Sequence, residues 1–114
     1  MRRPLEGIRV CDFCWVWAGP TCTGLLASLG AEVIKIESWL RLDSSRSTVR
    51  RYGADPAPPN QSLSFNTLNP GKLAVTLNMK HPRGIELIKE IVKVSDVVTN
   101  NFAAGVMERM GLGY

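Results

Sequence analysis

All three cysteines of the chain lie in one short stretch, CDFCWVWAGPTCTG, at residues 11–24. Thiolates bind zinc and carry out redox chemistry, so the spacing of Cys11, Cys14 and Cys22 raises both possibilities. A structural zinc site needs four ligands, and the single histidine, His81, is distant in sequence. A strand end also accommodates cysteines as small apolar side chains. We therefore expect free thiols and no metal site, with a reactive Cys22 near a helix N-terminus as the alternative.

The same stretch has features of a phosphate-binding turn, because a strand, a glycine-containing turn and a helix N-terminus present backbone N–H groups to anions. Glu37 follows Gly19 by eighteen residues, as does the acid that binds a ribose in dinucleotide-binding folds. The turn is AGPTCTG, however, without the G-x-G-x-x-G fingerprint, and Pro20 lacks an N–H donor. A dinucleotide-binding oxidoreductase domain is therefore an alternative rather than the first expectation.

Two tryptophans and several basic residues allow both structural and ligand-binding roles. Trp15 and Trp17 are two residues apart, so they point the same way if the preceding strand continues. They then either line a pocket for a flat ligand or pack in the core. Lys72 and Lys80 bracket a predicted strand, and Arg109 lies in the last predicted helix. Taken singly, each basic residue is expected to be a solvated surface charge.

Hydrophobic periodicity predicts the elements that position these residues. Alternating apolar residues indicate strands at residues 7–13, 33–37, 72–77 and 96–99. Helical spacing indicates helices that begin at Pro20 and Pro82, and a last short helix over residues 103–110. The alternation of strands and helices predicts an α/β fold with parallel β-α-β units. Residues 38–64 are predicted to form one long loop, of a length that is usually functional or mobile.

Length and composition fit one soluble domain. The chain has 114 residues, of which 45% are hydrophobic and 21% charged. No apolar run approaches the roughly 18 residues that span a bilayer, and the start MRRPLEG has no signal-peptide core, so we expect a cytoplasmic protein. The net charge of +4 favours an anionic partner. Because the basic residues form no consecutive block, phosphate-bearing small molecules fit as well as nucleic acid.

Five motifs occur in a characteristic order: PLEGIRVCDF with WAGP, LLASLGAEVIKIE, LDSSR, NPGKLAVTLNMKHPRG and SDVVTNNFAAGVMERMGLGY. Together they resemble the N-terminal segment of the family III CoA-transferases, which include formyl-CoA:oxalate CoA-transferase, carnitine CoA-transferase and α-methylacyl-CoA racemase. The resemblance runs from Pro4 to Tyr114, with residues 47–63 poorly matched. It implies a Rossmann-like parallel β-α-β segment of a larger interlocked CoA-transferase fold. Residues 1–114 would then be the N-terminal part of its CoA-binding α/β domain.

The resemblance also implies a site for coenzyme A, with an acyl-CoA and a carboxylic acid as substrates and no metal. The family's CoA contacts fall on seven positions of this chain: Val16, Ala18, Leu77, Lys80, Asn101, Phe102 and Arg109. The first two border the CoA, the next two contact its adenosine diphosphate part, the Asn-Phe pair lines the same pocket, and the arginine lies near the phosphates. Lysine and arginine suit this role through charge and donor geometry.

Some positions depart from the family pattern. Relatives often carry His or Arg, and then a polar residue, where this chain has Trp15 and Trp17, which implies a more apolar acyl pocket. A basic residue that follows the second strand in some members is Ser38 here, with Arg41 or Arg46 as possible substitutes. These departures concern the acyl substrate more than the CoA.

No catalytic residue is assigned within residues 1–114. In the transferase members the nucleophile is an Asp downstream of the segment corresponding to Tyr114, so we expect these residues alone to be inactive. Asp12 and Asp96 match structural positions. A racemase-type enzyme, which uses a downstream His and Asp, and a non-catalytic CoA-binding module are the alternatives. Full-length relatives form interlocked dimers, so we expect an interlocked homodimer that has neither nucleic acid nor membrane as a partner.

Overall fold

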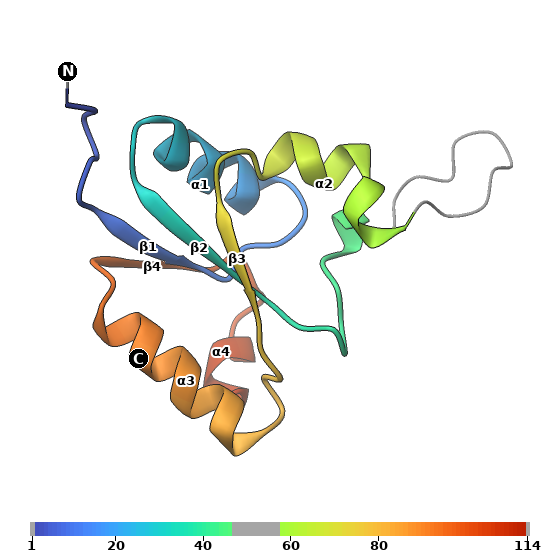
Figure 1. The fold of residues 1–114 in the computed structure, drawn as a ribbon. Helices are drawn as coiled ribbons and strands as arrows, with labels where there is room; N and C mark the ends of the chain where they lie inside the picture. Colours follow the sequence, from blue (N-terminus) through green and yellow to red (C-terminus); the bar gives the residue numbers. More distant parts are fainter. Residues whose placement is uncertain (1, 47–57, 114) are drawn as a thin grey trace, which may run out of the picture.

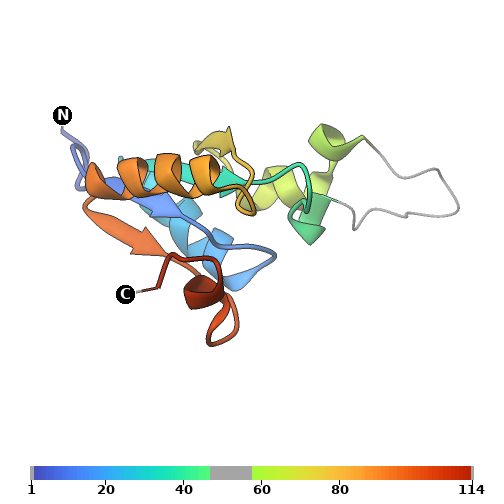
Figure 2. The ribbon, with the colours of Figure 1, turned by 90° about the horizontal axis from the view of Figure 1, so that it is seen from below.

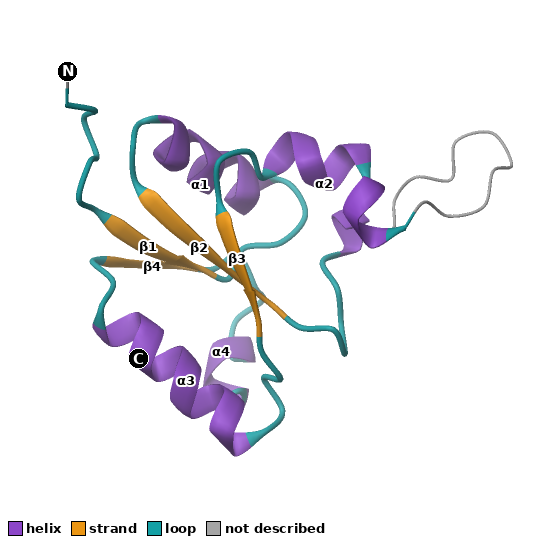
Figure 3. Cartoon of the chain, viewed as in Figure 1, coloured by secondary structure: helices purple, strands orange, loops and turns teal. Residues whose placement is uncertain are grey.

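Four strands form one sheet in the order β3-β2-β1-β4, and every neighbouring pair is parallel (Figure 3). The structure is a computed structural model that describes residues 2–46 and 58–113. The strands are β1 (Arg9–Asp12), β2 (Glu32–Glu37), β3 (Leu73–Thr76) and β4 (Val97–Thr99). The helices are α1 (Ala18–Ser28), α2 (Leu63–Leu68), α3 (Pro82–Lys93) and α4 (Val106–Arg109), with 3-10 turns η1 (Ser44–Arg46) and η2 (Pro59–Gln61).

Helices cover both faces of the sheet. Successive residues of a strand point to opposite faces, so neighbouring residues of β1 pack against different helices. Val10 of β1 packs in one core cluster with Ala27 of α1. Its neighbour Cys11 packs with Ile36 of β2 and Ile88 of α3 in a second cluster. Figure 1 shows the same division, with α1 and α2 on one side of the sheet and α3 and α4 on the other. The expected α/β fold class is therefore confirmed.

The predicted loop at residues 38–64 is wrong in part. Two 3-10 turns and the start of α2 fall inside it, while residues 47–57 lie outside the described part of the chain. The Ser62 hydroxyl accepts a hydrogen bond from the Phe65 N–H and so caps α2. With six residues, α2 is too short to give a clear helical period in the sequence.

Helix ends differ by a few residues from those predicted. α1 begins at Ala18, two residues before Pro20, and Pro20 lies within the first turn, where no backbone N–H is needed. α3 begins at Pro82 as predicted, and the His81 ring accepts a hydrogen bond from the Arg83 N–H. The last helix is shorter than predicted and covers only the four residues of α4.

Two views place the elements around the sheet. In Figures 1 and 2, α2 and η1 lie on one side of the molecule, and the segment that follows α4 lies on the other. None of the helices in the described part of the chain has both the length and the apolar content needed to cross a membrane.

Candidate functional site

A cleft of about 500 Å³ lies where the four parallel strands end. Each strand is followed by residues that line the cleft: Trp15 after β1, Ser38, Leu40 and Arg41 after β2, Met79 and Lys80 after β3, and Phe102 and Ala103 after β4. α4 closes the remaining side. Ligands of open parallel α/β sheets bind at the carboxyl ends of the strands, so this cleft is at the position expected for a ligand site.

Three basic side chains line the cleft, and none of its described lining residues is acidic. They are Arg41, Lys80 and Arg109, and all three are solvent-exposed. The Arg41 guanidinium lies over the Trp15 ring, 5.6 Å from the ring centroid. Phe102 meets the same ring edge-on, with centroids 5.4 Å apart. The cleft therefore combines aromatic surface with positive charge, a combination that suits a ligand with phosphates and a flat ring.

A second cleft of about 500 Å³ lies between α3 and the segment around α4. Its charged lining residues are Lys89 and Glu108, which carry opposite charges. Because the two charges offset each other, this cleft is less suited to a polyanion than the cleft at the strand ends.

Three of the seven predicted contact residues line the cleft at the strand ends: Lys80, Phe102 and Arg109. Leu77 instead packs partly buried in the core cluster around Ile88, where Met79 and Phe102 also pack. Its contribution to the cleft is thus to support residues that line it.

The other three predicted residues do not line the cleft. Both polar atoms of the Asn101 side-chain amide bind the backbone of Trp15: Oδ1 accepts from the Trp15 N–H at 2.8 Å, and Nδ2 donates to the Trp15 carbonyl at 2.7 Å. Val16 is the next residue and is exposed. Ala18, also exposed, is the first residue of α1. Asn101 therefore acts on the cleft through Trp15, and the role of all three as CoA contacts stays a prediction.

The two tryptophans do not share one side of a strand, because β1 already ends at Asp12. Val16, between them, has a φ of 71°, in the left-handed region. Trp15 is half-buried against Phe102, whereas Trp17 is 70% exposed. The condition under which Trp15 and Trp17 would point the same way, a continuing strand, is therefore not met, and of the two only Trp15 lines the cleft.

Gly19 is required by packing in the first turn of α1. A Cβ atom placed on Gly19 would lie 2.6 Å from the Cys14 Sγ and 3.1 Å from the Asn101 Cγ. No side chain fits in that space. The absence of a side chain at Gly19 thus allows α1 to approach the strand end.

Lys72 is buried, contrary to the expected solvated charge. Its ammonium lies 3.1 Å from the Asp12 carboxylate and also donates to Thr23, Asn69 and the Pro20 carbonyl. Burial alone would raise the pKa of Asp12, but hydrogen bonds from Thr23 and the Cys14 N–H and the Lys72 charge hold that pKa below its usual value. This ion pair joins β1, α1 and the start of β3, on the side of the sheet covered by α1.

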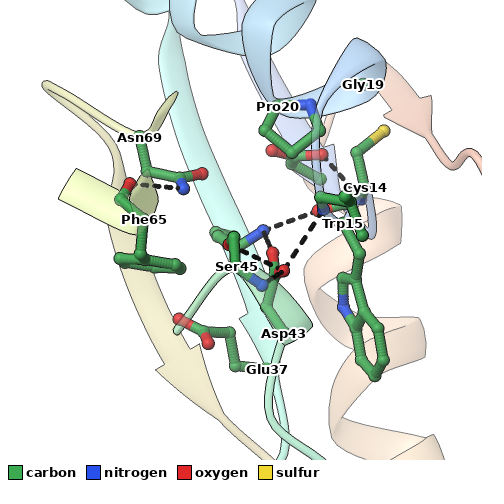
Figure 4. Close-up of polar contacts among 12 residues, drawn as sticks. Cys14, Trp15, Gly19, Pro20, Glu37, Asp43, Ser45, Phe65 and Asn69 are labelled. Carbon is green, nitrogen blue, oxygen red and sulfur yellow. Dashed lines mark hydrogen bonds and ion pairs between the residues drawn. The ribbon is translucent and has the colours of Figure 1, made fainter. Parts of the chain in front are cut away.

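A second buried ion pair lies beside the first. Lys35 of β2 and Asp43 are 1% and 0% exposed, with 3.1 Å between Nζ and Oδ2. Burial tends to raise the pKa of Asp43, but hydrogen bonds from the Ser45 N–H and hydroxyl, together with the Lys35 charge, outweigh burial and lower it. Figure 4 shows Asp43 and Ser45 facing Cys14 and Trp15.

Glu37, the acid at the spacing of a ribose ligand, is already bound within the chain. The Arg46 guanidinium makes two hydrogen bonds to its carboxylate, of 2.6 and 2.8 Å, and stacks 3.4 Å from the Phe65 ring centroid. Arg46 is therefore held in a largely buried pair and does not line the cleft. Of the two candidates for the basic residue after β2, Arg41 is the one that lines the cleft.

The three cysteines form no disulfide, and their environments differ. Cys11 and Cys14 are buried, and burial together with the Asp12 charge raises their pKa values to about 11 and about 12. Cys22 is exposed on α1. Within residues 2–46 and 58–113, no three His, Cys, Asp or Glu side chains are grouped in a way that would hold a metal ion.

Sequence patterns missed Lys35 and Asp43, whose pairing connects a strand interior to a loop residue. A lysine inside a strand of otherwise buried residues was the one available signal, because a buried lysine needs a partner. Together, these features define an α/β protein with a basic, aromatic-lined cleft at the carboxyl ends of a parallel sheet.

Comparison with known proteins names the family. The sequence model of CoA-transferase family III matches residues 5–114, so the chain belongs to this family. It is similar to the formyl-CoA:oxalate CoA-transferases of Bradyrhizobium sp. (strain ORS 278), at 43% identity over 111 residues, and Afipia carboxidovorans, at 41% over 114. These matches cover 97% and 100% of this chain but 25% and 26% of the relatives. The chain thus spans about a quarter of their length.

Solved structures agree with this assignment. A CAIB/BAIF family protein from Brucella suis superposes with a TM-score of 0.84 at 31% identity, over 100% of this chain and 30% of that one. A hypothetical protein (Rv3272) from Mycobacterium tuberculosis gives a TM-score of 0.82 at 33% identity, over 97% and 29% of the two chains. The parallel sheet with flanking helices is therefore the fold of this family's structures.

Proposed function

We propose that this chain provides the CoA-binding part of a family III CoA-transferase, which moves CoA between an acyl-CoA and a carboxylic acid. The observation that carries the proposal is the cleft at the strand ends, where Arg41, Lys80 and Arg109 gather beside Trp15 and Phe102. CoA has phosphates for the cations and an adenine ring for the aromatic surface. The similar proteins named formyl-CoA:oxalate CoA-transferase favour a transferase over a racemase-type enzyme.

Within the cleft, we assign Lys80 and Arg109 to the phosphates and Phe102 to the wall beside the adenosine. Leu77 supports this wall from the core. Three further residues belong to the turn that follows β1 or hold it: Val16, Ala18 and Asn101. Val16 and Ala18 would border the CoA, and Asn101 would fix Trp15 at the cleft. With this division of roles, the exposed cations bind the ligand, and the turn defines the shape of the cleft.

The acyl-transfer nucleophile, in this proposal, is a carboxylate outside residues 1–114. Asp12, Asp43 and Glu37 are buried, and each is held in an ion pair. A carboxylate that is already paired and enclosed is poorly placed to attack an acyl-CoA. We propose an interlocked, cytoplasmic homodimer for the intact protein, without a metal cofactor. The apolar residues Leu73, Val97 and Val98 of the two edge strands are 41–56% exposed, which suits burial against further parts of such an assembly.

Binding of a dinucleotide is the less favoured alternative. An acid that holds a ribose must have a free carboxylate, and both oxygens of Glu37 accept hydrogen bonds from Arg46. The segment between β1 and α1 also lacks the glycine fingerprint, and Pro20 in the first turn of α1 has no N–H to offer.

The test is a calorimetric titration of CoA into the full-length protein. Lys80→Ala and Arg109→Ala should each weaken CoA binding by about 1–3 kcal/mol, because each removes a charge-assisted contact to phosphate. Arg83→Ala is the matched control, since Arg83 is an exposed cation on α3 that pairs with Glu86 and lies outside the cleft. Unchanged affinity in both cleft variants, or binding of NAD in preference to CoA, would contradict the proposal.

A further inference from the structure

Side chains hold the backbone of three consecutive residues, Cys14 to Val16, in the turn that follows β1, and most of these side chains come from other parts of the chain. The Cys14 carbonyl accepts from Lys35 Nζ at 2.5 Å, and the Cys14 N–H donates to Asp12. Asn101 binds the Trp15 N–H and carbonyl. The Val16 N–H donates to Asp43 Oδ1 at 3.2 Å. A loop that only connects a strand to a helix does not need so many external partners.

Val16 is the reason such support is needed. Its φ of 71° lies in the left-handed region, and it is the single non-glycine residue with a positive φ in the described parts of the chain. Left-handed backbone is unfavourable for a β-branched residue, so this conformation persists only where the surroundings enforce it. Strain of this kind is concentrated at ligand-binding sites, and the strained residue lies beside Trp15, which lines the cleft.

Asp43 is the group placed to enforce this conformation. Oδ1 accepts hydrogen bonds from the Val16 N–H, the Ser45 N–H and the Ser45 hydroxyl, while Oδ2 faces the Lys35 ammonium. The lysine in turn donates to the Cys14 carbonyl. One carboxylate therefore connects the η1 turn, strand β2 and both ends of the strained turn.

We propose that Asp43, oriented by Lys35, is a positioning residue for CoA binding: it holds Val16 in the left-handed conformation and thereby presents the Trp15 side of the turn to the cleft. The proposal rests on the proposed function, because it takes CoA as the ligand of the cleft. It goes beyond that function by assigning a role to a buried pair that does not touch the cleft.

Asp43→Asn in the full-length protein is the direct test. Asparagine is neutral and replaces one carboxylate oxygen by an NH2 donor. If that donor faces Lys35, the buried ammonium loses its counter-charge, and if it faces Val16, the Val16 N–H loses its acceptor, so either orientation disrupts the arrangement. We expect faster amide hydrogen exchange in the peptide that covers residues 14–17, and CoA binding weakened about tenfold, as loss of a strained binding conformation predicts.

Val16→Gly separates positioning from general stability. Glycine adopts a positive φ without strain, so the turn needs less support from Asp43. In the V16G background, D43N should weaken CoA binding by less than about threefold, against about tenfold with valine. If D43N alone fails to fold, D43N/V16G should fold and bind CoA. A double variant that is as impaired as D43N would overturn the proposal.

Glu37→Gln is the matched control. Glu37 is also a buried carboxylate paired with a cation, Arg46, but no hydrogen bond connects it to residues 14–17 in the described structure. E37Q should change CoA affinity by no more than about twofold and leave exchange at residues 14–17 unchanged. An equal effect of E37Q and D43N on both readouts would show a merely structural role for Asp43. If the unmodified protein does not bind CoA, the proposed function fails, and amide exchange in the same variants still decides whether Asp43 holds the turn.

Discussion

The basic residues around the sheet of this protein include two groups with opposite environments. Lys35 and Lys72 are at most 2% exposed at their side chains, and each is paired with a buried aspartate. Lys80 and Arg109 are exposed and line the cleft, where no acidic residue is described among the lining residues. The buried group fixes the turn and the strand ends, whereas the exposed group is available for an anionic ligand.

This difference teaches that charge near a parallel-sheet edge is not by itself a sign of ligand binding. A buried ion pair contributes little net stability relative to an apolar pair, but it fixes one geometry, because loss of either partner leaves an uncompensated charge. An exposed cation contributes little to stability and keeps its charge available for a ligand. The following predictions test whether the two groups can be separated experimentally.

Lys72→Met has the largest expected effect. It leaves Asp12 buried without its cation, so the free energy of unfolding of the full-length protein should fall by about 3–5 kcal/mol. Denaturant unfolding measures this change. Lys93→Met is the control, since Lys93 forms an exposed pair with Glu90, and its cost should stay below about 1 kcal/mol. Equal losses in the two variants would remove the distinction between the groups.

Low pH should reduce the stability that the buried ion pair of Asp12 and Lys72 contributes. The pKa of Asp12 is below its ordinary value of 3.8, so the folded state binds fewer protons than the unfolded state in this range. The stability from its ionised form is therefore present above pH 3.8 and lost as the pH falls through the lower folded pKa. Asp12→Asn should be less stable than the unmodified protein near neutral pH, with a difference that shrinks in acid. A difference that is constant with pH would show that ionised Asp12 does not stabilise the fold.

The cysteines should have the smallest effect on ligand binding. Replacement of Cys11, Cys14 and Cys22 together by Ala or Ser should leave CoA affinity largely intact, with some loss of stability from the two buried positions. In the unmodified protein, a thiol reagent should modify Cys22 first, because Cys11 and Cys14 are buried and have raised pKa values. Stoichiometric zinc by elemental analysis, or loss of CoA binding in the triple variant, would contradict this.

The features that could be predicted from the sequence are those that depend on a local pattern of residues. Alternation and helical spacing located all four strands and the helices at Pro20 and Pro82, because apolar periodicity reflects burial directly. Three cleft residues, Lys80, Phe102 and Arg109, followed from the family resemblance. α2 was missed since its six residues give too short a period.

What could not be predicted depends on contacts between distant positions. Asp43 binds Val16 across 27 residues, and Asn101 binds Trp15 across 86, so neither contact has a local signature. The left-handed Val16 was also hidden, since a β-branched residue normally indicates extended backbone. Lys72 was expected in solvent because nothing near it in the sequence indicates a partner. Its partner, Asp12, lies 60 positions earlier.

Hydrogen exchange of the full-length protein with and without CoA tests the central claim most directly. If CoA binds the cleft at the strand ends, it should slow exchange in the segments that line it: residues 38–41, 79–80 and 102–110. The outer face of α3, around Arg83 and Glu86, should show no change and serves as the internal reference. Protection of α3 with none at the strand ends, or no protection anywhere in these segments under saturating CoA, would contradict the account.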